Sequence, residues 1–385
     1  MDDNGVISGH FLFPDGRVRQ GKVMIRGRKI AACEPGDPVP AGSREPVVIP
    51  GFVDVHVHGG GGADVMDASW ESLDTISATH AAHGTTTWLA TTVTHFPERI
   101  EQAIEAVKTY MQSDRNGAFG ARVAGLHLEG PFLNPNKRGA HRADALAPPD
   151  VRRLTAWCER AEGAVKMITL APELDGASEV IRETARRGIV VSAGHTEATW
   201  NDMENAVRCG LSHVTHLFNA MRPLNHREPG IAGFVLASRS VTADLIVDGV
   251  HVHPGVIDLV LSAVGPRRLL LITDAIRAAC MGDGEYDLGG LKVKVANGIA
   301  RIDNGSLAGS LLTLDEAFRR LVTVHGLDLA AASRMASLNP AALLGLDRSK
   351  GKIEPGMDAD LVCLDHGCNV RWTMVEGRVV YRADT

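Results

Sequence analysis

The segment PGFVDVHVHG, residues 50–59, joins an apolar, β-branched run to two histidines and ends in glycine. Alternate residues of a strand point to the same side, so His56 and His58 would project together from the end of this strand. The spacing alone decides nothing, because 16 histidines in 385 residues give about 0.7 such pairs by chance. His251 and His253 form a second pair. The meaning of the motif therefore depends on where the rest of the chain places its polar residues.

Seven further apolar runs of this kind follow along the chain, and amphipathic stretches such as 69–82 and 97–112 separate them. The pattern predicts strands at 52–58, 86–91, 123–128, 166–171, 189–194, 213–217, 242–247 and 269–273. Eight strands in about 220 residues, alternating with helices, predict an α/β fold of the (β/α)8 TIM-barrel type. A doubly wound open sheet is the alternative, and it is disfavoured because no G-x-G-x-x-G follows any strand.

The two chain ends differ from this alternating region. The first 50 and the last 35 residues are rich in glycine turns and short β-type runs, which predict antiparallel strands. An insert at 277–311 interrupts the last unit, and its segment LKVKVANGIARI predicts a hairpin with an Asn-Gly turn.

Composition limits the classes of function. A net charge of −6 without blocks of like charge argues against a general nucleic-acid or membrane-surface role. No apolar run approaches the roughly 20 residues of a membrane span, and the opening MDDNGVISGH does not read as a signal peptide. Six cysteines without C-x-x-C indicate reduced thiols and a cytoplasmic protein. Cys363 and Cys368 could face each other across a turn, but we expect two unrelated thiols.

Polar side chains recur where the predicted strands end. They follow strands 1, 3, 5, 6 and 8: His56 and His58, His127 and Glu129, His195, His216, and Asp274. The carboxyl ends of TIM-barrel strands are where active sites form. Imidazoles and carboxylates without cysteine fit Zn²⁺, Fe²⁺, Mn²⁺ or Co²⁺. We therefore expect a metal site, with Asp274 as the base that takes a proton from water and Glu129 as a possible bridge between two metals.

Several longer motifs are specific: HLEGPFLNPNKRGAH, GHT, THLFNAM, REPGIAG and TDA. On these the chain resembles the N-acetylglucosamine-6-phosphate deacetylases of the metal-dependent amidohydrolase superfamily. The similarity runs over nearly the whole chain and includes PGFVDVHVHGGGG, LAGSLLTLDEAFR and KGKIEPGMDADLV. It implies a hydrolase barrel over 51–350, flanked by a small β-sandwich domain built from 1–50 and 351–385.

The resemblance also implies the ligands of a divalent metal. Glu129, His195 and His216 match the ligands common to the family. His56 and His58 match the additional ligands of members that hold two metals. One or two ions per subunit are therefore expected, zinc first, with iron, manganese or cobalt as alternatives.

Further residues match the substrate-contacting and catalytic positions of the family. Asp274 matches the general base, which also touches the metal, and His251 matches the residue that helps to polarise the acetyl carbonyl. Asn219 and Ala220 match contacts to the sugar phosphate, and His141 matches another substrate contact.

Arg227 matches an arginine that reaches the phosphate from a neighbouring subunit, which implies a homodimer. An arginine fork suits a phosphate group. His253 has no counterpart in the family, so we expect it to be structural or at the surface.

Two positions refine these expectations. Other amidohydrolases carry a carboxylated lysine at the end of strand 4, whereas Lys166 stands at the start of that strand. This favours Glu129 as the bridging carboxylate. After TDA the family usually has small residues, and here Arg277 and Cys280 either reshape the pocket or simply lie in the insert.

The expected reaction is hydrolysis of the acetamide of N-acetylglucosamine 6-phosphate. The galacto epimer, or another N-acyl amino sugar phosphate, is the alternative substrate. A catalytically dead barrel that serves as a binding module would lack ligands, yet every expected ligand and the base are present.

Overall fold

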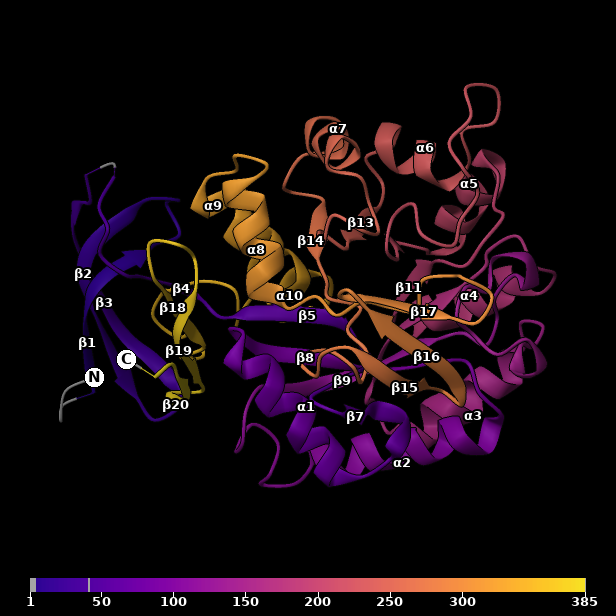
Figure 1. Ribbon diagram of the computed structural model, residues 1–385, viewed down its shortest axis with the longest axis horizontal. Coiled ribbons are helices and arrows are strands. Elements are labelled where there is room, and N and C mark those ends of the chain that lie inside the picture. Colours follow the sequence, from indigo (N-terminus) through magenta and orange to yellow (C-terminus); the bar gives the residue numbers. More distant parts are fainter. Residues whose placement is uncertain (1–4, 41, 385) are drawn as a thin grey trace.

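The computed structural model describes residues 5–40 and 42–384, so residues 1–4 of the acidic opening segment lie outside it. Figure 1 shows a helix-wrapped barrel and, at its side, a separate sheet in which both chain ends meet. Among the described residues, no helix is long and apolar enough to cross a membrane. All six cysteines are free, Cys363 and Cys368 included, as the sequence predicts.

Eight parallel strands form the barrel, each hydrogen-bonded to its neighbour along the chain. A bridge between Val57 and Ala275 links the first strand to the segment after the last and nearly closes the ring. The predicted fold class is thus confirmed. The strands are β5 (Phe52–Val57), β8 (Thr85–Thr92), β9 (Arg122–Glu129), β10 (Val165–Leu170), β11 (Val190–Ala193), β12 (His213–Val214), β13 (Thr242–Leu245) and β14 (Leu269–Leu271).

One helix follows each barrel strand and buries its apolar stripe against the sheet. In α2 the stripe has helical spacing, because Ile100, Ala103, Ile104 and Val107 are all buried. Burying each larger side chain of this kind contributes about 1.5–3 kcal/mol. The helices are α1 (Trp70–Ala82), α2 (Pro97–Met111), α3 (Val151–Ala161), α4 (Ala177–Arg186), α5 (Trp200–Cys209), α6 (Gly230–Ala237), α7 (Pro254–Val264) and α8 (Leu314–Thr323), followed by α9 (Leu329–Ser333) and α10 (Asn339–Leu343).

The chain ends form one seven-stranded sheet with its own apolar core, which includes Phe11, Ile30 and Leu361. The amino-terminal and carboxy-terminal parts meet where β4 pairs antiparallel with β18. The predicted domain boundaries themselves stay a prediction. In sheet order the strands are β20 (Arg378–Arg382), β19 (Val370–Val375), β18 (Leu361–Leu364), β4 (Val47–Pro50), β1 (Val6–Leu12), β2 (Val18–Arg26) and β3 (Lys29–Pro38).

Gly51 alone separates β4 of this sheet from β5 of the barrel. Its backbone N–H donates to the Asp360 carbonyl at 2.9 Å. A Cβ atom at this position would lie 2.3 Å from the Thr86 side chain, so only glycine fits the close approach to β8. The first barrel strand is therefore a direct extension of the small sheet.

The insert folds as predicted and adds one strand that the sequence analysis missed. β16 (Leu291–Ala296) and β17 (Ile299–Ile302) form the hairpin, with φ of 53° at Asn297 and 71° at Gly298. Both angles are positive, as an Asn-Gly hairpin turn requires. The extra strand is β15 (Gly284–Leu288), joined to β16 through Gly289 and Gly290, a Gly-Gly turn signal. A shorter pair, β6 (Gly59–Gly60) with β7 (Ala63–Asp64), follows the first barrel strand.

Three of the predicted site residues lie just past their strands. The sequence pattern predicts strand 6 to residue 217, but β12 ends at Val214. His195, His216 and Asp274 have φ of 49°, 32° and 51°, the left-handed region that non-glycine residues rarely adopt. Such conformations cost on the order of 1–3 kcal/mol each and persist where the surrounding structure enforces them. The chain turns sharply here, which brings each side chain over the barrel mouth.

Candidate metal centre and active site

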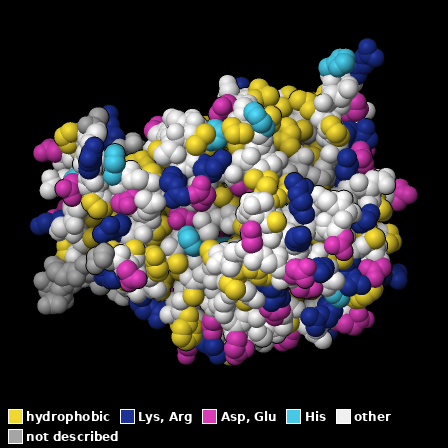
Figure 2. Space-filling model, viewed as in Figure 1, with side chains coloured by type: hydrophobic (Ala, Val, Ile, Leu, Met, Phe, Trp, Pro, Cys, Tyr) yellow, Lys and Arg dark blue, Asp and Glu magenta, His cyan; other side chains and the backbone are white. Residues whose placement is uncertain are grey.

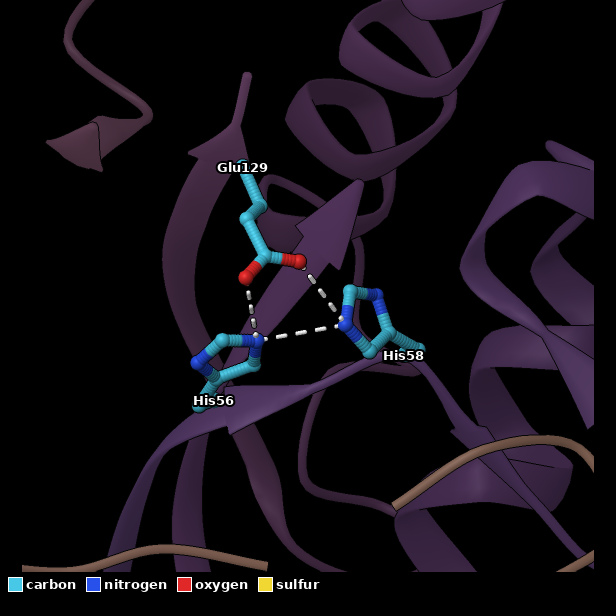
Figure 3. A group of neighbouring side chains, drawn as sticks. All are labelled: His56, His58 and Glu129. Atoms are coloured by element: carbon cyan, nitrogen blue, oxygen red, sulfur yellow. Dashed lines mark hydrogen bonds and ion pairs between the residues drawn. The ribbon is translucent and has the colours of Figure 1, made fainter. Parts of the chain in front are cut away.

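His56, His58 and Glu129 converge at the carboxyl ends of β5 and β9 (Figure 3). The two Nε2 atoms lie 3.1 Å apart. Glu129 Oε1 lies 3.5 Å from His56 Nε2, and Glu129 Oε2 lies 3.2 Å from His58 Nε2. Asp274 completes the group, because its Oδ1 lies 3.4 Å from His56 Nε2 and 3.3 Å from His58 Nε2.

A second group shares the same carboxylate. Glu129 Oε1 lies 3.2 Å from His195 Nε2 and 3.1 Å from His216 Nε2, and these two nitrogens are 3.1 Å apart. The turn that carries His216 is fixed by its backbone N–H, which donates to Asp244 Oδ1. Glu129 thus stands between two pairs of imidazoles, and its role as a bridge between two metals stays a prediction.

Backbone carbonyls fix the orientation of two of these imidazoles. His58 Nδ1 lies 3.2 Å from the Thr91 carbonyl oxygen, and His195 Nδ1 lies 2.8 Å from the Lys137 carbonyl oxygen. A carbonyl only accepts, so Nδ1 carries a hydrogen in both rings, and in neutral His195 the Nε2 lone pair faces Glu129. Burial and the nearby His141 lower the pKa of His195 to about 4, so it is a neutral donor. Lone pairs converging on a carboxylate are a donor set that fits a divalent cation.

The charges of the site also fit a divalent cation. Burial opposes ionisation of Glu129, but His56 and His141 hold its pKa well below the usual range. Burial likewise opposes ionisation of Asp274, but His56 and His58 lower its pKa to about 2. These carboxylates in turn outweigh burial at His58 and raise its pKa to about 10. A buried cluster that favours positive charge this strongly suits a metal ion.

His141 differs from the other imidazoles in its hydrogen bonding. The backbone N–H of Thr94 donates to His141 Nδ1 at 3.1 Å, so the hydrogen of neutral His141 sits on Nε2. That Nε2 lies 3.3 Å from Glu129 Oε2. Although His141 groups with Glu129 and His195 by distance, it is a hydrogen-bond donor rather than a metal ligand.

His251 is held by a carboxylate that the sequence analysis missed. Its Nδ1 lies 2.6 Å from Asp248 Oδ2, while Asp248 Oδ1 accepts the backbone N–H groups of Val250 and His251 at 2.8 Å each. Burial opposes ionisation of Asp248, but His251 outweighs it and lowers the pKa. The signal in the sequence is an aspartate three residues before the histidine, in the segment DGVH.

A second carboxylate that the sequence analysis missed, Asp54, supports the first strand from below. Its Oδ2 accepts the Thr273 hydroxyl at 2.6 Å, and its Oδ1 accepts the His56 backbone N–H at 3.2 Å. Full burial raises the pKa of Asp54 to about 7. Asp54 thereby links β5, which carries His56, to the turn at Asp274. In the sequence, Asp54 stands two residues before His56, the same spacing that relates His56 to His58.

These groups open into a cavity of about 390 Å³. Most predicted substrate and metal residues line it: His58, Glu129, His141, His195, His216, Asn219, Ala220, His251 and Asp274. His56 lies fully buried behind them. The insert supplies a wall through Leu288, Ser306 and Leu307, and Lys137 adds a positive charge. Loop residues of this kind follow no periodic pattern, so the sequence analysis did not find them.

Four other residues from the sequence analysis lie away from the described lining of this cavity. Arg227 is exposed in the loop before α6. Arg277 does not reshape the pocket, because it pairs with Asp67 at 2.5 Å. Cys280 lies at the surface beside His83. His253 caps α7 by accepting the Gly255 N–H, which confirms its structural role.

Comparison with known proteins identifies the family of the chain. The sequence pattern of the amidohydrolase family matches residues 47–380. The chain belongs to the amidohydrolase family. This family is metal-dependent, and the described histidine and glutamate groups of this amidohydrolase can hold a metal.

Curated relatives and solved structures narrow the comparison. The amidohydrolase is 38% identical to N-acetylglucosamine-6-phosphate deacetylase from Bacillus subtilis, over 94% of this chain and 93% of the relative. It is 37% identical to N-acetylgalactosamine-6-phosphate deacetylase from Escherichia coli O157:H7, over 96% and 97%. A variant of N-acetyl-D-glucosamine-6-phosphate deacetylase from Mycobacterium smegmatis, in complex with N-acetyl-D-glucosamine-6-phosphate, superimposes with a TM-score of 0.90 at 37% identity, covering 97% and 98%.

Proposed function

We propose that this amidohydrolase hydrolyses N-acetylglucosamine 6-phosphate to glucosamine 6-phosphate and acetate. The observation that carries the proposal is the sharing of Glu129 between two imidazole pairs on the floor of a cavity that also holds Asp274 and His251. The similar proteins from Bacillus subtilis and Mycobacterium smegmatis, both named N-acetylglucosamine-6-phosphate deacetylase, support it.

The metal would be one or two divalent ions, zinc first. Glu129, His195 and His216 would hold one ion, and His56 and His58 with Glu129 would hold a second. A bound divalent cation supplies Lewis acidity toward water and toward a carbonyl oxygen. Three histidine or carboxylate ligands are the usual protein contribution to such a site.

Asp274 would be the general base. Its carboxylate is ionised at neutral pH, since the pKa is lowered to about 2, and it lines the cavity beside His58. It would take a proton from the attacking water and later deliver that proton to the amine nitrogen that leaves. A single carboxylate can perform both transfers because the acetyl carbon and the nitrogen are adjacent atoms of the amide.

Two imidazoles would polarise the acetyl carbonyl. His141 presents Nε2–H toward the cavity, because the N–H of Thr94 occupies Nδ1. His251 also lines the cavity, and the Asp248 carboxylate 2.6 Å from its Nδ1 holds the ring in place. Donors aimed at a developing oxyanion in a buried site are among the larger contributions to catalysis.

The sugar phosphate would lie toward Asn219 and Ala220, with Arg227 of a second subunit completing its site. In Figure 1 the segment between β12 and α6, which carries Arg227, projects at the upper right, and Figure 2 shows basic and histidine side chains at its tip. An arginine that projects from the chain and does not reach its own cavity suits delivery to a neighbour. A homodimer follows from this reading, with an active site shared between subunits.

The galacto epimer is a second candidate substrate, since the relative of Escherichia coli O157:H7 carries that name at 37% identity. The two sugars differ in the orientation of one hydroxyl. A side-by-side comparison of kcat/KM for both phosphates decides between them. The compartment is proposed to be the cytoplasm, in line with six unpaired thiols.

The experiment that tests the reaction is acetate release from N-acetylglucosamine 6-phosphate by purified protein, before and after chelation and after metal is returned. We expect release that chelation abolishes and Zn²⁺ or another divalent ion restores. If no ion yields acetate from either epimer, the proposed function is wrong. Inorganic phosphate release should stay at background, because the site is proposed to act on the amide.

A further inference from the structure

Three side chains from three separate elements line up at the surface, outside the barrel cavity. Cys280 lies in the segment after β14, His83 ends α1, and Asp315 lies in the first turn of α8. Cys280 Sγ lies 3.4 Å from His83 Nε2, and His83 Nδ1 lies 3.1 Å from Asp315 Oδ1 and 3.2 Å from Asp315 Oδ2. A thiol, an imidazole and a carboxylate in this order form the arrangement that activates nucleophilic cysteines.

The carboxylate sets the state of the imidazole. Asp315 only accepts, so Nδ1–H of His83 donates to it and Nε2 faces the sulfur. Burial opposes protonation of His83, but Asp315 and Cys280 outweigh it and raise its pKa to about 10. Protonated Nε2–H therefore points at Sγ and can donate to the sulfur when it reacts as a thiolate, the nucleophilic form of cysteine. His80, one turn earlier on α1, adds no charge, because burial lowers its pKa to about 4.

The other five cysteines lack this combination of access and partners. Cys280 is exposed, whereas the remaining thiols are buried or half-buried. Burial raises the pKa of Cys33 and of Cys363 to about 11. Burial also raises the pKa of Cys158 and of Cys368. A reagent for thiolates in the native protein should therefore select Cys280.

The segment around Cys280 is held in place by the backbone. The Ala279 carbonyl accepts the Gly61 N–H at 2.9 Å, and the Met281 N–H donates to the Ala278 carbonyl at 3.0 Å. Cys280 itself has a φ of 66°, which is rare for a side chain of this kind. The thiol is thus presented to solvent in a fixed position, with His83 behind it.

We propose that Cys280 is a thiol-modification site that exchanges with low-molecular-weight disulfides of the glutathione type, with His83 and Asp315 as positioning residues. Sγ attacks one sulfur of the disulfide, a new S–S bond joins Cys280 to that half, and the other half leaves with the electron pair of the broken bond. The Cys280 sulfur is oxidised and the departing sulfur is reduced. The proton lost by the thiol ends on the departing thiolate or in water.

The test measures reaction of the metal-loaded full-length protein with dithiobis(nitrobenzoate), followed by the colour of the released thiolate. We expect one fast thiol per chain. Cys280→Ser should abolish the fast phase, whereas the matched control Cys33→Ser should keep it. With oxidised glutathione, peptide mass spectrometry should place the adduct on Cys280. A missing fast phase, or one that persists in Cys280→Ser, would overturn the proposal.

A second arm tests the positioning residues. Asp315→Asn should slow the fast phase tenfold or more, with deacetylase activity as the folding control, since none of these residues lines the cavity. We also expect Asp315→Asn to change the pH profile of the fast phase between about pH 6.5 and 8.5, because the carboxylate holds the proton on His83. A rate and a pH profile that Asp315→Asn leaves unchanged refute the role of His83 and Asp315.

Discussion

Replacement of Asp248 by asparagine tests the proposed polarising role of His251. Asparagine keeps the Oδ1 that accepts the Val250 and His251 backbone N–H groups, so the turn should survive. It places a neutral amide where the Asp248 carboxylate now lies 2.6 Å from His251 Nδ1. The His251 side chain is only 6% exposed, so solvent does not screen the pair. The change therefore removes the negative charge beside the ring and sets an amide NH2 group, which only donates, against His251 Nδ1, so that nitrogen must accept.

The magnitude follows from that single contact. A hydrogen bond between charged groups contributes about 1.5–3 kcal/mol. If that stabilisation is made only in the transition state, kcat should fall about 10- to 150-fold, at 1.36 kcal/mol for each factor of ten. The KM should stay within about twofold, because the ground state does not depend on the positive ring.

The assay is steady-state acetate release, with a double-mutant cycle between Asp248→Asn and His251→Ala. In the background without His251, Asp248→Asn should have no further effect on kcat. His253→Ala, in the second His-x-His pair, is the matched control and should leave kcat unchanged, since it only caps α7. If Asp248→Asn lowers kcat equally without His251, or retains more than half the activity, the reasoning is wrong.

Four further outcomes are expected. Asp274→Asn should reduce kcat about 10²- to 10⁴-fold at near-normal metal content by plasma emission, and near-normal turnover would remove its role as base. Glu129→Gln should lower the content of both metals together, because one carboxylate serves both imidazole pairs; loss of one ion alone would contradict the bridge. Mixing inactive Arg227→Ala with inactive Asp274→Asn should restore about a quarter of the activity through hybrid dimers, and none if sites are not shared. Chelation should lower Tm, because an ion present at about 1,000 times its Kd raises the free energy of unfolding by about 4 kcal/mol. An unchanged Tm would argue that the ion does not stabilise the fold.

Much of the barrel and of the cluster at its mouth follows from local patterns. Alternation in a strand predicts that His56 and His58 share a face. The end of the third barrel strand places Glu129 at the same edge of the barrel. The Asn-Gly pair specifies the insert hairpin through its positive φ angles. Such features depend on neighbours in sequence, so the sequence predicts them.

Other features depend on contacts between distant segments. Strand 6 ends early because the turn at His216 is held by Asp244 on the next strand, and no local pattern announces that bond. Arg277 lies away from the pocket because its guanidinium donates a hydrogen bond to Asp67, which is 210 positions away in the chain. Leu307 reaches the cavity only because the whole insert folds over it. These placements are set by tertiary packing, which overrides local propensity.

The junction at Gly51 limits how the two bodies can be engineered apart. Because β4 runs into β5 with one residue between them, a barrel excised at this point would begin directly at β5 and lose β4, which β1 and β18 hold by hydrogen bonds. His56 lies in β5 and His58 follows it directly. Removing the seven-stranded sheet would therefore make the positions of these two imidazoles less fixed, although the sheet lies outside the cavity. Insertions or circular permutations in this protein are better made in the insert hairpin. The turn of this hairpin at Asn297 and Gly298 does not line the cavity and is not joined directly to β5.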